Sequence, residues 1–217
     1  MFINANHALN KIMNYLSTLK ALENTYYALR HGESLANVAG LIVSTPENGI
    51  PNYGLSDKGR AQVERSVGLA ISNNELNAKT HIISSDFKRA HESAQIAQQL
   101  LDAGKTDKEI TLDARLRERD FGDFELKDNT YYQTVWDNDA IDSSHTIDNA
   151  ESADSVMQRA TELVVELENN HEGEAFLLVA HGDTIQILQT AFQKISASKQ
   201  REMKHLETAE IRLLELA

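Results

Sequence analysis

Two apolar segments of this chain end in the same pattern of histidine, glycine and an acid. "YYALRHGE" places Arg30 and His31 directly after an apolar run, and "AFLLVAHGD" does the same for His181. A third apolar segment, in "IISSDFKR", is followed a few residues later by Arg89. The sequence therefore offers two arginines and two histidines, each just beyond a segment typical of a buried strand.

These residue types together suit the transfer of a phosphoryl group. A guanidinium presents forked N–H donors that match phosphate oxygens, and a neutral imidazole is a competent nucleophile at pH 7. Arg30 and Arg89 would neutralise the phosphate dianion and hold the equatorial charge of a loose transition state. We therefore predict a reaction that passes through a phosphohistidine.

An alkoxide leaving group also needs a proton, and one acid-rich stretch supplies candidates for the donor. The segment "RLRERDFGDFE" follows another apolar run, and Glu118 is its first acid. The alternatives nearby in sequence or in space are Glu33, Asp120, Asp123 and Glu125.

The elements that must position these residues alternate along the chain. Strands are predicted at residues 25–29, 81–84, 110–116 and 175–180, and helices at 56–73, 86–104, 151–170 and 183–195. The segment at 209–216 fits either a strand or a helix. This alternation predicts an α/β fold, a three-layer α/β/α sandwich with a mostly parallel central sheet. The carboxyl ends of parallel strands share one edge, so the arginines and histidines should converge there, beside N–H donors of helix N-termini.

The rest of the chain predicts one domain with an extension. Residues 25–217 should form a single domain, in which residues 35–56 form a loop and residues 119–150 form a polar, aromatic excursion. Residues 1–24 should form a helical extension, because their apolar residues recur at helical spacing. These residues are Leu9, Ile12, Met13, Leu16, Leu19 and Leu22. This helix would pack on its own domain or on a second subunit, so an oligomer could form through it.

Composition narrows the class of protein further. The 217 residues carry a formal net charge of −12 and no cysteine. The negative charge argues against general binding to nucleic acid or to anionic membranes, and no apolar run approaches the roughly 20 residues that span a bilayer. The N-terminus lacks a signal-peptide pattern. The lack of cysteine excludes a thiolate nucleophile and fits a reducing compartment, so we expect a cytoplasmic location.

Four ordered blocks of the sequence resemble the histidine phosphatase superfamily, which has the phosphoglycerate-mutase-like fold. The blocks are "RHGESLAN" at residues 30–37, "LSDKGRAQ" at 55–62, "SSDFKRAHESA" at 84–94 and "VAHGDTI" at 179–185. A single R-H-G would be a weak signal, but four blocks in order at sensible separations are specific. The resemblance covers about residues 25–190.

The resemblance implies a role for each matching residue. His31 corresponds to the phosphorylated nucleophile of the family, and Arg30, Arg89 and His181 correspond to its phosphate pocket. The family chemistry uses no metal ion and no cofactor, and we expect neither here.

Three further positions complete the comparison with the family. Asn37 stands at the asparagine that helps to hold the phosphate, and Glu118 stands at the proton donor. The chain departs from the family pattern L-R-E-x-x-F-G-x-x-E-G at Leu126, where glycine is usual.

Other classes of phosphate-handling protein have less support. A metallophosphatase would need D-x-H, G-D-x-x and G-N-H-[DE] motifs, which the sequence lacks, and two arginines would repel its metal ions. "WDNDAI" is similar to the D-x-D nucleophile of haloacid-dehalogenase-like phosphatases, but it follows no clear buried strand. The P-loop and serine-hydrolase motifs are absent. A non-catalytic binding module of the same fold stays open, although such members typically lose the histidine or an arginine.

We expect a metal-independent phosphatase that hydrolyses phosphate monoesters, with a 2,3-bisphosphoglycerate-dependent phosphoglycerate mutase as the alternative. The mutases that the sequence resembles carry long insertions with a basic cluster between the glutamate block and the second histidine. Here residues 120–158 contain Lys127 and no arginine, so a second anionic group would find little to hold it there. The expected partner is a phosphorylated small molecule, with a phosphorylated protein also open.

Overall fold

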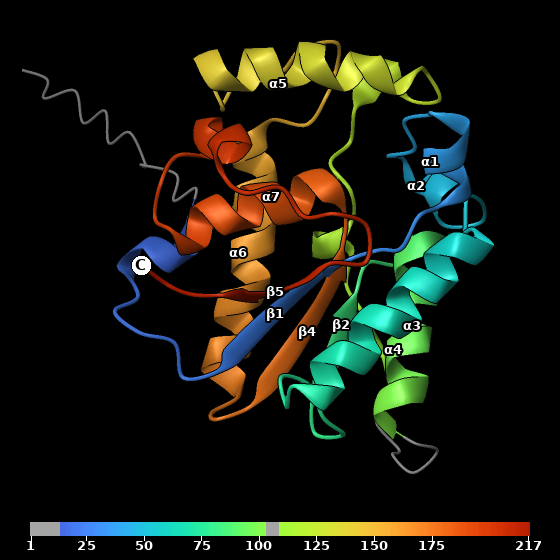
Figure 1. The fold of residues 1–217 in the computed structure, drawn as a ribbon. Coiled ribbons are helices and arrows are strands. Elements are labelled where there is room, and N and C mark those ends of the chain that lie inside the picture. The colour runs from blue at the N-terminus through green and yellow to red at the C-terminus, as the bar shows by residue number, and fades with distance from the viewer. Residues whose placement is uncertain (1–13, 103–108) are drawn as a thin grey trace, which may run out of the picture.

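A computed structural model describes residues 14–102 and 109–217 and has three layers (Figure 1). A five-stranded sheet lies between two groups of helices. The helices α3 (Asp57–Ser72) and α4 (Lys88–Asp102) cover one face, and α6 (Ala153–Asn170) and α7 (Gly182–Phe192) cover the other. The predicted α/β/α sandwich is confirmed.

The sheet has the strand order β3–β2–β4–β1–β5. Its strands are β1 (Thr25–Arg30), β2 (His81–Ser84), β3 (Thr111–Leu112), β4 (Ala175–Ala180) and β5 (Ile211–Leu214). All neighbouring pairs are parallel except β1 and β5, so the mostly parallel sheet is confirmed. The C-terminal segment whose type the sequence left open is an antiparallel edge strand.

The burial of β4 explains its central place in the sheet. Phe176 and Leu178 belong to the apolar cluster that includes α6 and α7, whereas Leu177 and Val179 belong to the cluster that includes α3 and α4. A strand covered on both faces needs a continuous apolar run rather than an alternating one, and "AFLLVA" provides it. The residue that follows this run is thereby fixed at the carboxyl edge of the sheet.

Residues 35–56 were predicted to be loop, and this prediction was wrong in part. They contain the short helices α1 (Leu35–Ala39) and α2 (Pro46–Gly49). Ser34 caps α1 by accepting the Asn37 N–H, and a proline stands at the start of α2. Proline is tolerated in a first helical turn because the N–H that it lacks would have no partner there. The high proline and glycine content therefore marked helix ends as well as loop.

The strand predicted at residues 110–116 is shorter than expected. Only Thr111–Leu112 pair with β2, and Ala114–Leu116 form a 3-10 turn that Asp113 caps. β3 is an edge strand that pairs with β2 alone. Its pairing can therefore end after two residues, although the apolar pattern continues beyond it.

Residues 119–150 leave the three layers and cross the carboxyl end of the sheet (Figure 1). They contain two 3-10 turns, Gly122–Phe124 and Asn129–Tyr131, followed by α5 (Tyr132–Ile141). This excursion has its own apolar cluster, made of Ile42, Phe121, Phe124, Val135 and Ala150. The cluster holds the excursion as a cover above the strand ends.

Leu126, where the family pattern has glycine, keeps the backbone conformation that glycine favours. Its φ is +59°, in the left-handed region that costs a side-chain-bearing residue roughly 1–2 kcal/mol. Its N–H donates to the carbonyl oxygen of Ile42 at 2.8 Å. The turn after Glu118 therefore forms despite the substitution, because contacts with the rest of the excursion hold it.

The predicted N-terminal extension is only partly described. Its apolar residues before residue 14 lie outside the described residues. The remainder forms one 3-10 turn, Tyr15–Thr18, ahead of β1. Leu16 is fully buried in the cluster with α6 and α7, and Leu19 and Leu22 pack against that cluster. This part of the extension packs on its own domain.

None of the helices in the described ranges is long and apolar enough to cross a bilayer.

Candidate active site

Five of the six predicted site residues line one cavity of about 210 Å³ at the carboxyl edge of the sheet. They are Arg30, His31, Asn37, Arg89 and Glu118. The sixth, His181, is fully buried beside them, and its ring centroid lies 5.1 Å from that of His31. Arg30 ends β1 and pairs in register with the last residue of β4, so the two histidines that follow are neighbours. The sheet thus brings together residues that lie far apart in the sequence.

The hydrogen bonds of His31 indicate which ring nitrogen carries the hydrogen. Nδ1 lies 2.7 Å from the carbonyl oxygen of Gly32, which can only accept, so Nδ1 is the donor. Nε2 then has a free lone pair, and it accepts the Nε–H of Arg89 at 3.1 Å. Burial, followed by the charges of Arg89 and Arg30, lowers the pKa of His31 well below its ordinary value. The ring is therefore neutral near pH 7.

Both arginines are anchored through part of the guanidinium and leave the rest unpaired. Arg89 Nη2 donates to the carbonyl oxygen of Val43 at 2.9 Å. Arg30 Nη1 donates to the carbonyl oxygen of Leu206 at 2.8 Å and lies 2.9 Å from His205 Nε2. In the part of the chain that the structure describes, the buried atoms Arg89 Nη1 and Arg30 Nε have no hydrogen-bond partner. Each arginine therefore has a fixed orientation and a free donor.

His181 adds a third unpartnered atom to this set. Its Nε2 lies 2.8 Å from the hydroxyl of Ser85, and burial followed by the charge of Arg89 lowers its pKa well below the ordinary value. Among the described residues its buried Nδ1 has no hydrogen-bond partner, and this nitrogen carries the ring proton when the hydroxyl donates to Nε2.

Buried polar atoms are normally hydrogen-bonded, so these unpaired atoms mark a site for a polar ligand. Three of the five exceptions among the described residues belong to Arg30, Arg89 and His181. An anion with several acceptor oxygens is the kind of ligand that such donors would bind.

Glu118 is the predicted acid that lines the cavity. It is 8% exposed, and its Oε1 accepts the backbone N–H of Arg119 at 3.0 Å and that of Thr184 at 3.4 Å. Because donors hold Oε1, Oε2 is the oxygen available to carry a proton toward a leaving group.

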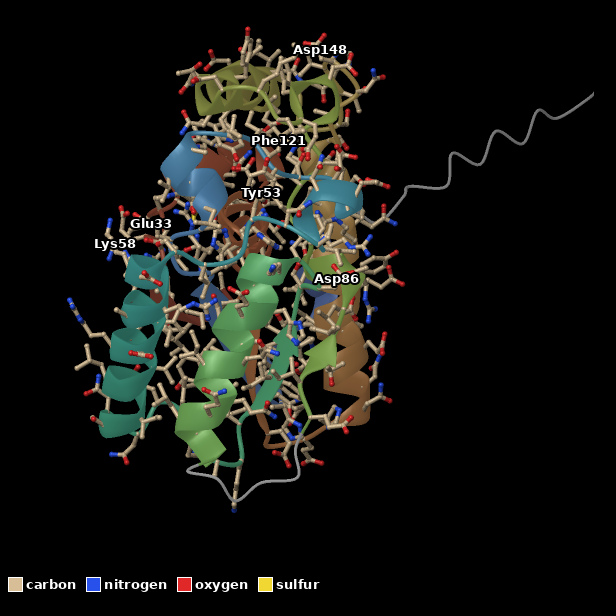
Figure 2. All side chains as sticks on the ribbon, turned by 90° about the vertical axis from the view of Figure 1, so that its right-hand side faces the viewer. Glu33, Tyr53, Lys58, Asp86, Phe121 and Asp148 are labelled. Carbon is tan, nitrogen blue, oxygen red and sulfur yellow. The ribbon has the colours of Figure 1, made fainter. Side chains whose placement is uncertain are left out.

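The alternative acids lie outside the cavity. Glu33 forms an ion pair with Lys58 at the start of α3, with 2.7 Å between the charged atoms (Figure 2). Asp120, Asp123 and Glu125 accept hydrogen bonds from residues that do not line the cavity. The geometry therefore favours Glu118 over these four.

Asn37 caps a helix and faces the cavity at the same time. Its Oδ1 accepts from the N–H of Ser34 at 3.0 Å and from the hydroxyl of Ser34 at 2.9 Å. Within the described part of the chain its side-chain amide nitrogen makes no hydrogen bond, so this nitrogen is left as a donor.

The sequence analysis did not single out several residues that also line the cavity, and four of them carry an aromatic ring or a guanidinium. Tyr132 and Trp136 come from α5, and Arg201 and His205 come from the segment after α7. They do not belong to any of the four sequence blocks. The fold alone brings them to the strand ends. The aromatic content of the excursion was the one signal that pointed toward the first two.

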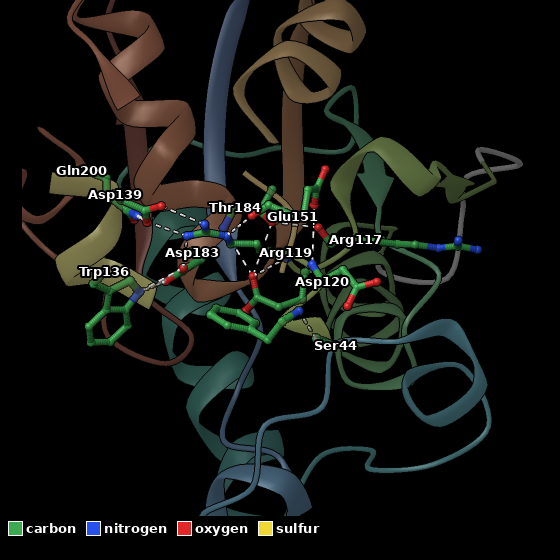
Figure 3. A network of polar contacts seen from close by, with 12 residues as sticks. Ser44, Arg117, Arg119, Asp120, Trp136, Asp139, Glu151, Asp183, Thr184 and Gln200 are labelled. Atoms are coloured by element: carbon green, nitrogen blue, oxygen red, sulfur yellow. Dashed lines mark hydrogen bonds and ion pairs between the residues drawn. The ribbon is translucent and has the colours of Figure 1, made fainter. Parts of the chain in front are cut away.

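A polar network fixes α5 above the cavity (Figure 3). Trp136 Nε1–H donates to both carboxylate oxygens of Asp183 at 3.0 Å. Arg119 is fully buried, makes two hydrogen bonds to Asp139 at 2.5 and 2.8 Å, and lies 3.6 Å from Asp183. Gln200 donates to Asp139 at 2.7 Å. Burial, followed by the charge of Glu118, raises the pKa of Asp183 to about 6.

This network also accounts for "WDNDAI", which was compared with a D-x-D nucleophile. The segment lies on α5 rather than at the end of a strand, and Asp139 forms an ion pair with Arg119.

Across residues 14–102 and 109–217, no group of three or more histidine, aspartate or glutamate side chains is arranged to hold a metal ion.

The sandwich fold and the arginine–histidine cavity define the class of protein, and comparison with known proteins agrees. Residues 26–217 match the histidine phosphatase superfamily (branch 1), and the chain belongs to this family. The resemblance carried by the four sequence blocks is confirmed.

Relatives in this family have differing names. Phosphoglycerate mutase-like protein 4 of Arabidopsis thaliana is 30% identical over 191 residues, which cover 83% of this chain and 75% of the relative. A probable phosphoglycerate mutase of Erwinia tasmaniensis, GpmB, is 27% identical over 183 residues, which cover 82% and 79%.

Solved structures show the same fold. YhfR of Bacillus stearothermophilus has a TM-score of 0.70 and 28% identity, with coverage of 88% of this chain and 90% of that one. A mycobacterial glucosyl-3-phosphoglycerate phosphatase in complex with VO3 has a TM-score of 0.70 at 23% identity, with coverage of 87% and 90%. At that identity the second comparison supports the shared fold alone.

Proposed function

We propose that this protein is a metal-independent phosphatase that hydrolyses phosphate monoesters through a phosphohistidine at His31. The observation that carries the proposal is the set of unpaired, buried donors on Arg30, Arg89 and His181 around a neutral His31. Such a set matches a tetrahedral dianion, and two guanidiniums supply the charge that a metal ion would otherwise supply.

Substrate binding would exchange one hydrogen bond for several. The Nε–H of Arg89, which now donates to His31 Nε2, would turn to a phosphate oxygen and release the lone pair. Arg30 Nε, Arg89 Nη1 and His181 Nδ1 would bind the other oxygens. With the negative charge compensated, the neutral nitrogen can approach phosphorus.

In the first chemical step the Nε2 lone pair forms a bond to phosphorus while the ester P–O bond breaks. The departing oxygen takes the proton of the Glu118 carboxyl. The ring becomes cationic in the intermediate, and the carbonyl oxygen of Gly32, 2.7 Å from Nδ1, stabilises it. Glu118 is left as a carboxylate close to phosphorus.

In the second step water replaces the leaving group. The Glu118 carboxylate takes a proton from this water, the water oxygen bonds to phosphorus, and the Nε2–P bond breaks. Inorganic phosphate leaves, His31 regains its lone pair, and Glu118 regains its proton. Each group thus returns to its starting state.

A mutase is the second candidate because two relatives are named as phosphoglycerate mutases or mutase-like. A mutase would have to hold a second anionic group and keep water away from the phosphohistidine. Neither cation of the excursion lines the cavity: Arg119 pairs with Asp139, and Lys127 lies over the rings of Phe124 and Tyr131 at 5.4 and 5.7 Å. The excursion thus supplies no cation to hold a second anionic group, which favours hydrolysis.

A panel of phosphate esters that includes 3-phosphoglycerate, assayed with and without EDTA, tests the proposal. The expected result is release of inorganic phosphate that chelation leaves intact. Formation of the isomeric ester without release of phosphate would support the mutase instead. Activity that EDTA abolishes and a divalent ion restores would contradict the arginine-based mechanism.

A further inference from the structure

His205 is the second partner of the Arg30 guanidinium. Its Nε2 lies 2.9 Å from Arg30 Nη1, which also donates to the carbonyl oxygen of Leu206 at 2.8 Å. A guanidinium can only donate, so His205 Nε2 is the acceptor and the proton of the neutral ring is on Nδ1. Both N–H groups of Nη1 are therefore used. This leaves Arg30 Nε, buried and without a partner among the described residues, to bind a ligand.

The backbone that carries His205 is held from a neighbouring strand. His205 belongs to the segment between the 3-10 helix η5 (Ala197–Glu202) and β5. Arg212 on β5 donates to the carbonyl oxygens of Lys204 and His205 at 2.5 and 3.0 Å. The imidazole therefore reaches Arg30 from a fixed backbone, although His205 itself is exposed.

The charged groups that face His205 come from three parts of the chain: Arg30 from β1, Arg201 from η5, and Glu207 and Glu210 from the segment before β5. Arg201 is held in place by the ring of Trp136, 3.8 Å from its guanidinium carbon, and Glu210 pairs with Arg212. Burial, followed by the charges of Arg30 and Arg201, lowers the pKa of His205 below its ordinary value. The ring is therefore neutral near pH 7 and gains a second proton only in acid.

We propose that His205 positions Arg30 for phosphate binding only while its ring is neutral, so that the cavity holds phosphate more weakly in acid. This inference rests on the proposed function, in which Arg30 binds the transferred phosphate. A hydrogen on His205 Nε2 would face the N–H of Arg30 across 2.9 Å, and two donors repel each other. Arg30 would keep the carbonyl oxygen of Leu206 as an anchor and lose the second contact that fixes its orientation.

A protonated His205 would also bring a positive charge to the wall of the cavity, and this charge attracts an anion. Because His205 is exposed, water and salt screen that attraction. The lost hydrogen bond acts instead on the guanidinium that contacts the phosphate, whose donors are useful only in a fixed orientation. We therefore expect the loss of orientation to outweigh the gain of charge.

The test measures the binding of inorganic phosphate to the full chain by titration calorimetry from pH 5 to pH 8. His205→Gln is compared with wild type, because an amide oxygen can accept from Arg30 at every pH. Both proteins share the titration of phosphate and of the other residues, so these cancel in the ratio of their dissociation constants. The wild-type constant divided by that of the variant should rise by about 3- to 10-fold from pH 8 to pH 5, the scale of one hydrogen bond.

His205→Leu tests the same contact independently, because leucine has no acceptor. The tighter binding of wild type relative to this variant should be present at pH 8 and disappear at pH 5. His145→Gln is the matched control, since His145 is exposed and does not line the cavity, and it should keep the wild-type pH dependence. Thermal unfolding at each pH checks that the proteins are folded.

The outcomes separate this inference from the proposed function. A wild-type to His205→Gln ratio that stays constant from pH 5 to pH 8 would overturn the inference alone. Tighter binding by wild type than by His205→Gln in acid would do the same, because it would show that the charge of the ring matters more than its acceptor. Failure of all these proteins to bind phosphate at any pH would overturn the proposed site and the inference with it.

Discussion

The Nε–H of Arg89 donates to the Nε2 of His31 across 3.1 Å. His31 follows β1 and Arg89 lies in the first turn of α4, yet the proposed nucleophile and a proposed phosphate ligand are already aligned. Gly32 on the other side of the ring fixes the proton on Nδ1. The site is therefore preorganised for a neutral nucleophile before substrate arrives, which is the main physical source of catalytic power in such sites.

Replacing Arg89 should lower catalysis both through the lost charge and through the lost forked geometry of the guanidinium. Arg89→Ala should lower kcat/KM by about 10²- to 10³-fold, the scale of removing one preorganised donor. Arg89→Lys should recover only part, because an ammonium lacks the fork that contacts Val43 and the phosphate together. Steady-state kinetics on phenyl phosphate measures both. Full recovery in the lysine variant would mean that charge alone matters.

Glu118→Gln should be selective in its damage. If Glu118 protonates the leaving oxygen, its loss should slow alkyl phosphates by about 10²- to 10⁴-fold. It should slow the first step for p-nitrophenyl phosphate far less, because nitrophenolate leaves without a proton. The ratio of kcat/KM for the two substrates, in wild type and variant, is the measurement. An equal loss on both substrates would mean that Glu118 positions the substrate instead.

Asp183 should make the folded protein less stable as the pH rises from about 4 to about 6. Burial, followed by the charge of Glu118, raises its pKa from 3.8 to about 6. Within that window the folded state keeps a proton that the unfolded state has released, so stability falls with rising pH.

Asp183→Asn should remove this loss while keeping an acceptor for Trp136. The free energy of unfolding of the variant, relative to wild type, should rise across the window by on the order of 1–3 kcal/mol. Urea denaturation at several pH values measures it. A difference that stays constant from pH 4 to pH 6 would argue against a protonated Asp183.

Arg119 and Asp139 should tolerate joint replacement better than single replacement. Both side chains are 1% exposed and pair at 2.5 Å, so removing one leaves an uncompensated buried charge, at a cost of about 3–5 kcal/mol. Arg119→Met combined with Asp139→Leu should cost less than either single change. Chemical denaturation of the three variants gives the comparison, and a double loss equal to the sum would show that the charges do not act as a pair.

The strands that carry the site could be predicted because each is an uninterrupted apolar run. In β4 burial on both faces demands such a run, and the histidine after it must then lie at the carboxyl edge. That His31 and His181 share one edge follows from parallel strands, whereas their contact also requires the pairing of β1 with β4. The family motifs predicted the places of Asn37 and Glu118 in the site. The apolar periodicity of the sequence does not predict them.

Trp136 and Arg201 could not be predicted in the same way. In α5 only Val135 and Asp139 are buried, so this helix has no apolar stripe to show where it packs. The Arg119–Asp139 pair and the contact between Trp136 and Asp183 hold it instead, and both join residues that are distant in sequence. The position of Arg201 depends in turn on that of Trp136.

Trapping the covalent intermediate tests the central claim most directly. The protein is mixed with an ester that carries radiolabelled phosphate, quenched in base within milliseconds, and digested for peptide analysis. The account predicts label on His31, stable in base and lost in acid, with none on a His31→Ala protein that has also lost turnover. Glu118→Gln given p-nitrophenyl phosphate should accumulate more label, because the carboxylate that activates water is missing. Turnover without label on His31, or label on a different residue, would contradict the account.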